Sequence, residues 1–262
     1  MRRLTRSIRS RFENLVLAPR FGAITSVRTS LPMVALTFDD GPHPTVTQRL
    51  IDMFARHGAQ ATHFLVGAAA EARPDLVHAL TDAGHEVANH TYSHTSLVRL
   101  SQEERRSELQ KGREALGPRS NSFVRPPYGH YDMECARDVH ALGMRCVMWT
   151  RHISDWEPAS VETLTERLRK AVVPGNIVLL HEALYTATAE NRQDRERMLE
   201  AVDTVLGEMA GKVRFGTLTE LLKSGRPVLQ LVTKLGEDEF IEAQRPGAVQ
   251  EERRAQDDIL TP

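Results

Sequence analysis

The sequence is poor in cysteine and in aromatic residues. Only two of the 262 residues are cysteines, and aromatic residues make up 5% of the chain. So few aromatic side chains disfavour a stacking platform for single-stranded nucleic acid. We expect Cys135 and Cys146 to be free thiols, with a disulfide between them as the alternative. Free thiols would weakly favour a reducing compartment.

The sequence also lacks an excess of either charge and any long apolar run. A formal net charge of −1 gives no indication of a nucleic-acid or strongly acidic partner. No apolar stretch reaches the roughly 18 residues that a membrane-spanning helix needs, and none follows the basic residues 1–12 as in a secretory signal. We therefore expect a globular protein that is cytoplasmic or peripheral to a membrane. The basic segment 1–30 would be either solvated or in contact with anionic lipid.

Short apolar runs alternate with charge-patterned helical segments. We expect strands at 33–38, 61–66, 86–89, 122–125, 145–149, 176–180 and 213–217. We expect helices at 45–57, 74–83, 101–116, 132–142, 160–172 and 192–209. Strands separated by helices indicate parallel βαβ units. Apolar periodicity fades beyond residue 225, so we expect one domain over residues 31–225, followed by a charged, mobile tail at 226–262.

The run TFDDGP places two adjacent carboxylates, Asp39 and Asp40, at the end of an apolar strand. Like charges this close disfavour joint ionisation. A cation that binds one carboxylate, and leaves the other free to act as a base, would separate their roles. His90 and His94 stand four residues apart, which on a helical turn puts both imidazoles on one side. That spacing alone is typical of two packed histidines, but together with the aspartates it favours a three-ligand catalytic zinc site.

Other polar residues also follow predicted strands. Residues 125–128 follow the fourth strand, Asp155 follows the fifth, and His181 ends the sixth. Parallel α/β folds and β/α barrels place their active sites at the carboxyl ends of strands. The sequence therefore predicts one domain with one site at this rim.

Five short motifs follow one another in the order TFDDGP, NHTYSH, RPPYG, SDW and LLH. Together they resemble the motifs of the NodB-type polysaccharide deacetylases, carbohydrate esterase family 4, over about residues 31–225. The resemblance implies an α/β fold, a distorted (β/α) barrel of about seven parallel strands. It also implies a metal-dependent hydrolase that removes N-acetyl groups from N-acetylglucosamine in peptidoglycan or chitin-like glycans.

The resemblance implies a catalytic role for each matched polar residue. Asp39 would be the general base, and Arg125 would pair with it and orient it. His181 would be the general acid, with Asp155 tuning it.

A metal site and an acetyl pocket are implied in the same way. Asp40, His90 and His94 would bind Zn²⁺, or another divalent transition metal such as Co²⁺. The backbone N–H of Tyr128 would stabilise the oxyanion, and Leu179 would line the pocket for the acetyl group.

Two residues depart from the family pattern. His152 stands where the family often has an aspartate, which puts support from that carboxylate in doubt. His63 replaces an apolar aromatic residue in the second predicted strand, and we interpret it as a packed, hydrogen-bonded histidine, with a substrate-cleft role as the alternative.

Other functions fit parts of the pattern. A non-catalytic carbohydrate-binding protein on the same fold is one alternative. A deformylase or deacetylase of a lipid-linked sugar is another, and the basic N-terminal segment makes a membrane-surface substrate plausible. A two-carboxylate glycosidase is disfavoured, because adjacent aspartates are poorly arranged to flank a glycosidic bond at separations of roughly 5–9.5 Å.

Overall fold

A single large sheet dominates the computed structural model, which describes residues 17–185 and 194–231. Its strands pair in parallel in the order β6-β5-β4-β3-β2-β8-β7, and β9 pairs with the beginning of β2. The strands are β2 (Met33–Gly41), β3 (Thr62–Leu65), β4 (Glu86–Asn89), β5 (Phe123–Val124), β6 (Arg145–Cys146), β7 (Arg151–His152), β8 (Ile177–His181) and β9 (Arg214–Phe215). The parallel α/β sheet predicted from the sequence is confirmed.

The connection between β6 and β7 shows why this sheet is curled. These strands lie at opposite edges of the sheet, yet only residues 147–150 separate them. Seven flat strands at their usual spacing would hold the edges about 29 Å apart, whereas the connecting chain spans at most about 18 Å. The sheet must therefore bend until its edges approach each other, as in a distorted barrel. The sequence prediction missed β7, because two residues carry no periodicity.

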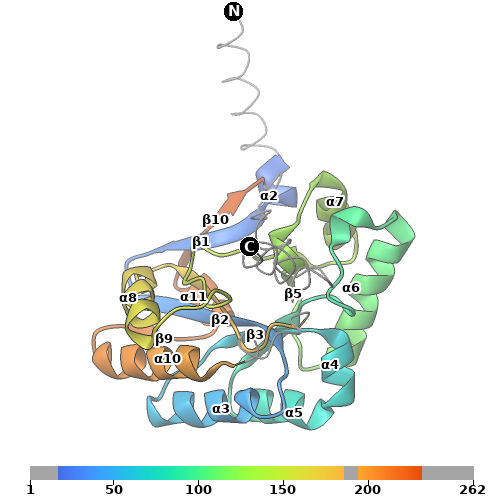
Figure 1. The fold of residues 1–262 in the computed structure, drawn as a ribbon. Coiled ribbons are helices and arrows are strands. Elements are labelled where there is room, and N and C mark those ends of the chain that lie inside the picture. Colours follow the sequence, from blue (N-terminus) through green and yellow to red (C-terminus); the bar gives the residue numbers. More distant parts are fainter. Residues whose placement is uncertain (1–16, 186–193, 232–262) are drawn as a thin grey trace, which may run out of the picture.

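Helices cover the outside of the sheet (Figure 1). They are α3 (Val46–Arg56), α4 (Gly67–Ala72), α5 (Pro74–Asp82), α6 (Gln102–Leu116), α7 (Met133–Ala141), α8 (Val161–Ala171) and α10 (Glu196–Glu208), and an eighth helix, α11 (Leu218–Lys223), packs against the cluster that contains Ala35 and Phe64. Six of them fall where the sequence predicted helices; α4 and α11 were not predicted. Local chemistry sets some of their starts. In α6 the Ser101 side chain and Glu104 form a reciprocal capping box that satisfies two backbone N–H groups.

Both faces of the sheet are covered. All nine residues of β2 are buried, which is the pattern of a central parallel strand packed between layers. Its apolar side chains, Val34, Leu36 and Phe38, join a core that includes residues of α3, α8 and α10. The polar end of β2 is buried as well, so Asp39 and Asp40 are held in a rigid, desolvated setting.

Regular structure extends past the predicted domain boundaries at both ends. A helical turn, α2 (Ala18–Phe21), and strand β1 (Ala23–Thr29) lie inside the predicted N-terminal segment. β1 pairs antiparallel with β10 (Gly225–Gln230), of which all but the first residue lie inside the predicted tail. β10 is half exposed and lacks alternating apolar residues, so sequence periodicity could not reveal it. The fold runs at least from residue 18 to residue 230; the rest of the predicted tail lies outside the described residues.

Two further expectations can be compared with the structure. Cys135 and Cys146 are buried and free, as predicted. No helix in the described ranges is long and apolar enough to cross a membrane.

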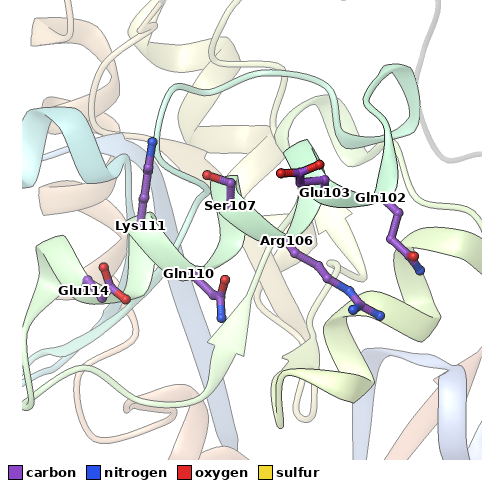
Figure 2. Close-up of a pocket in the computed structure, with 7 residues that line it drawn as sticks. All are labelled: Gln102, Glu103, Arg106, Ser107, Gln110, Lys111 and Glu114. Carbon is purple, nitrogen blue, oxygen red and sulfur yellow. The ribbon is translucent and has the colours of Figure 1, made fainter.

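The outward face of α6 is polar (Figure 2). A shallow hollow runs along it, lined by Gln102, Glu103, Arg106, Ser107, Gln110, Lys111 and Glu114. None of these residues belongs to the five sequence motifs, and a single helix supplies all of them, so we interpret the hollow as a solvated helix face.

Candidate active site

The motif residues gather at the carboxyl ends of the parallel strands. Asp39 and Asp40 lie at the end of β2, His90 directly follows β4, and His181 ends β8. Because β2 pairs with β8 in register, Asp39 lies beside His181. The rim predicted from the sequence is therefore where these side chains meet.

Asp40, His90 and His94 form a group that can hold a metal ion, with one ligand atom from each residue and all three atoms within 4.8 Å of one another. The Oδ1 atom of Asp40 lies 3.0 Å from Nε2 of His94 and 3.3 Å from Nε2 of His90. All three residues are buried, with 2–3% of their surface exposed.

The hydrogen bonding of this group fits a cation. His90 Nδ1 lies 2.7 Å from the carbonyl oxygen of Arg125. A carbonyl can only accept, so Nδ1 carries the proton and Nε2, which faces Asp40, is the nitrogen available to bind a metal ion. Asp40 Oδ1 is buried and has no hydrogen-bond partner in the described part of the chain. A buried carboxylate oxygen facing imidazole lone pairs is stabilised when a metal ion lies between them.

Asp40 has a strained backbone and a carboxylate that is fixed by a hydrogen bond. Its backbone is in the left-handed region, with φ of 71°, which costs energy for a residue with a Cβ. Its Oδ2 atom accepts a hydrogen bond of 3.0 Å from the backbone N–H of Tyr185. One oxygen is thus used to fix the carboxylate, and the other faces the histidines.

Asp39 pairs with a completely buried arginine. Arg125 donates to Asp39 Oδ1 over 2.6 Å and to the Thr37 hydroxyl over 2.9 Å. The same guanidinium donates to the carbonyls of Val147 and Met148 and lies over the Phe64 ring. Burial lowers the pKa of Arg125, and the charge of Asp39 opposes that effect. Fixed by four acceptors, the guanidinium holds Asp39 in one orientation.

His181 is paired with Asp155. Its Nδ1 lies 3.0 Å from Asp155 Oδ1, and its backbone N–H donates to Oδ2 over 2.8 Å. Burial lowers the pKa of His181, but the nearby charge of Asp155 and its hydrogen bond outweigh burial, and the pKa is raised above its ordinary value. Burial likewise raises the pKa of Asp155, and the charge of His181 outweighs it, so that pKa is lowered. The pair is poised as carboxylate and imidazolium.

Leu179 and Tyr128 lie close to these groups. Leu179 is buried in β8 and pairs in register with Thr37 of β2. It stands two residues before His181, so the side chains of Leu179 and His181 lie on the same face of the sheet. Tyr128 has a left-handed backbone with φ of 60°, and its ring lies 4.9 Å from that of His94. The structure therefore brings together all nine site residues predicted from the sequence.

Comparison with known proteins shows which family the sequence belongs to. Residues 26–147 match the polysaccharide deacetylase family. A peptidoglycan-N-acetylglucosamine deacetylase of Bacillus cereus is 30% identical over 197 residues, covering 74% of this chain and 69% of the relative. A chitooligosaccharide deacetylase of Sinorhizobium fredii is 33% identical over 158 residues, covering 59% of this chain and 74% of the relative. The chain belongs to the polysaccharide deacetylase family.

Solved structures show the family's fold and its functional range. A peptidoglycan N-acetylglucosamine deacetylase in complex with 4-naphthalen-1-yl-N-oxidanyl-benzamide has a TM-score of 0.72 and 28% identity, covering 82% of this chain and 99% of that one. A carbohydrate esterase family 4 pseudoenzyme from Bacillus anthracis has a TM-score of 0.67 and 27% identity, covering 80% of this chain and 72% of that one. Active enzymes and a pseudoenzyme thus share this fold. Whether the chain is catalytically active therefore has to be inferred from its site residues.

Backbone strain marks the same site. In the described ranges, the non-glycine residues with positive φ are Asp40, Thr91, His94, Tyr128 and Ser154. Each lies in one of the five motifs or directly beside a site residue. Such conformations cost about 1–3 kcal/mol each and persist where the surroundings impose them. Their concentration at one rim indicates a preorganised functional site.

His63 and His152, which depart from the family pattern, differ in burial and in their neighbours. His63 is fully buried, stacks on Phe38 and places Nδ1 3.1 Å from Glu182 Oε2. It is therefore packed and hydrogen-bonded, as we interpreted it. His152 is half-buried at the rim, with its ring 5.0 Å from that of Trp156.

Sequence reasoning missed two buried charged residues near the site. Glu182 accepts a hydrogen bond of 3.0 Å from the backbone N–H of His43 and also contacts Thr47, which fixes the turn that follows Asp40. Arg195 contacts Asp155 from the start of α10. Neither stood out in the sequence, because Glu182 only extends a matched motif and Arg195 lies in a run of charged residues.

Proposed function

We propose that this protein is a metal-dependent N-deacetylase that removes acetyl groups from N-acetylglucosamine residues of peptidoglycan or chitin-like glycans. Its family membership and the substrates of its named relatives support this reaction class. One structural observation carries the proposal. Two adjacent carboxylates have different nearest partners: Arg125 for Asp39, at 2.6 Å, and His94 and His90 for Asp40, at 3.0 and 3.3 Å.

Asp40, His90 and His94 would hold the metal, which we propose to be Zn²⁺, with Co²⁺ as a substitute. Two nitrogens and one carboxylate oxygen form a three-ligand set of the kind found in catalytic zinc sites. A zinc ion bound there would supply a water of lowered pKa and polarise the acetamide carbonyl. Neighbouring groups keep the ligands ready, since the Arg125 carbonyl orients His90 and the Tyr185 amide orients Asp40.

Asp39 would take the proton of the attacking water. A general base has to be ionised and correctly aimed. Arg125 aims the carboxylate, because it donates to Asp39 Oδ1 and is itself fixed by three further acceptors. The carboxylate can then accept a proton without turning away from the substrate.

His181 would give a proton to the departing amine. An amine cannot leave readily as an anion, so a general acid is required on this side of the reaction. Asp155 holds the Nδ1 proton, which leaves Nε2 as the nitrogen that transfers its proton. The Tyr128 N–H would donate to the developing oxyanion, where one such donor is typically worth about 2.7–4 kcal/mol. Leu179 would contact the acetyl methyl group.

The test is acetate release from chitooligosaccharides and peptidoglycan by protein stripped with a chelator and then given zinc. We expect no release from stripped protein, release after zinc is added, and none from His94→Ala. His78→Ala, which alters an exposed histidine of α5, should behave like the wild type. Release that is unaffected by the chelator would reject the metal-dependent mechanism.

The same experiment tests the alternatives. Zinc and sugar binding without acetate release would indicate a non-catalytic carbohydrate-binding protein. A similar structure, from Bacillus anthracis, is a pseudoenzyme of carbohydrate esterase family 4. Activity restricted to formylated or lipid-linked sugars would change the substrate and keep the site. A cytoplasmic or membrane-peripheral location also stays a prediction, because residues 1–16 lie outside the described residues.

A further inference from the structure

Arg195 is a buried cation that no sequence motif includes. It stands at the start of α10, with 6% of its surface exposed. Its Nη2 atom donates to the carbonyl oxygen of Asp155 over 2.8 Å, and its Nη1 atom lies 3.4 Å from Asp155 Oδ2. Arg195 therefore contacts both the backbone and the carboxylate of the residue that pairs with His181.

The helix gives no reason for a cation at this place. The N-terminus of a helix carries partial positive charge, which disfavours a positively charged side chain there. Arg195 also makes no side-chain cap for α10. A buried guanidinium is costly unless it is paired, and Asp155 supplies that pairing. The contact with Asp155, and not helix stability, accounts for the position of this residue.

The contacts of Asp155 show what the pairing does. Oδ1 faces the imidazole of His181, while Oδ2 accepts from the His181 backbone and faces Arg195. Without Arg195, Oδ2 would keep only the His181 backbone N–H, and the Asp155 carbonyl would lose its guanidinium donor. The carboxylate would then be less firmly held against Nδ1 of His181. Arg195 thus contacts Asp155, which in turn contacts the imidazole of His181, and all three side chains are buried.

We propose that Arg195 is a positioning residue for the general acid, acting on His181 through Asp155. This inference rests on the proposed deacetylase function, because it assigns Arg195 to the step in which the amine is protonated. It predicts a selective defect. Removal of Arg195 should slow substrates whose leaving group needs a proton and spare those whose leaving group does not.

The test compares two substrates of zinc-loaded protein. A chitooligosaccharide loses an amine and needs the acid, whereas 4-nitrophenyl acetate loses a stable phenolate and does not. For Arg195→Met we expect kcat on the oligosaccharide to fall at least about tenfold, and the rate on the ester to change less than about twofold. Arg195→Lys, which keeps the charge, should recover part of the loss.

A control and a double variant complete the design. Arg197→Met removes an exposed arginine two residues along α10 and should leave both rates unchanged. In an Asp155→Asn background, Arg195→Met should lower kcat by less than about twofold more, because residues that act through one another are not additive.

Three results would overturn the inference. These are an equal loss on both substrates, an unchanged rate on the oligosaccharide, or full additivity with Asp155→Asn. If the wild type releases no acetate at all, the proposed function itself fails. An active wild type with an unaffected Arg195→Met variant rejects this inference alone.

Discussion

Arg125→Met should destabilise the protein far more than loss of a surface arginine would. The Arg125 side chain is 0% exposed, and its guanidinium donates to Asp39, to the Thr37 hydroxyl and to two backbone carbonyls. Methionine fills much of the same space but leaves the Asp39 charge buried and unpaired. Breaking a buried ion pair from one side costs about 3–5 kcal/mol. For a domain of this size, about 4 kcal/mol corresponds to a fall in Tm of about 12 °C.

The assay is thermal and urea unfolding of chelator-treated protein, followed by acetate release after zinc is added. Arg49→Met is the matched control, because Arg49 and Glu196 form a pair whose side chains are 47% and 64% exposed. Such surface pairs contribute about 1 kcal/mol or less, so Tm should fall by less than about 3 °C. Arg125→Met should also lower kcat at least about tenfold, since Asp39 loses its orientation. Equal destabilisation by the two substitutions would refute this reasoning.

Three further predictions follow from the site. In Gly41→Ala, the new Cβ would lie 2.3 Å from Glu182 Oε2, so we expect a loss of at least about 2 kcal/mol in urea unfolding; Gly207→Ala has room in α10, and comparable losses would contradict the account. The pKa of His181 is raised above 6.5 by Asp155, so kcat should fall as pH rises through that higher pKa, and Asp155→Asn should move this limb to lower pH; an unmoved limb would reject the pairing. An N-hydroxybenzamide, which chelates divalent cations, should inhibit zinc-loaded protein competitively with substrate, as a steady-state assay can show.

The predictable part of the molecule is the part with strong local signals. The runs that became β2 and β8 are apolar and end in polar residues, and α6 carries its own capping box. Parallel pairing then brings the strand ends to one rim. For this reason the sequence alone predicts that the site residues lie together.

The remainder depends on tertiary contacts that leave no local pattern. β1 and β10 are far apart in the sequence and pair only in the folded chain. Arg195 acquires its importance from burial against Asp155, which its charged neighbours in the sequence do not reveal. His63 looked anomalous until Glu182 supplied its partner. His63 and Glu182 are 119 residues apart in the sequence, and Arg195 and Asp155 are 40 residues apart.

The central claim is that the two adjacent carboxylates have separate tasks. It is tested most directly by measuring bound zinc and acetate release in the same samples of Asp39→Asn, Asp40→Asn and the exposed control Asp52→Asn. The account predicts that Asp39→Asn keeps one equivalent of zinc and loses acetate release by about 100-fold or more, that Asp40→Asn loses both, and that Asp52→Asn keeps both. Undiminished turnover by Asp39→Asn, or full zinc binding by Asp40→Asn, would contradict it.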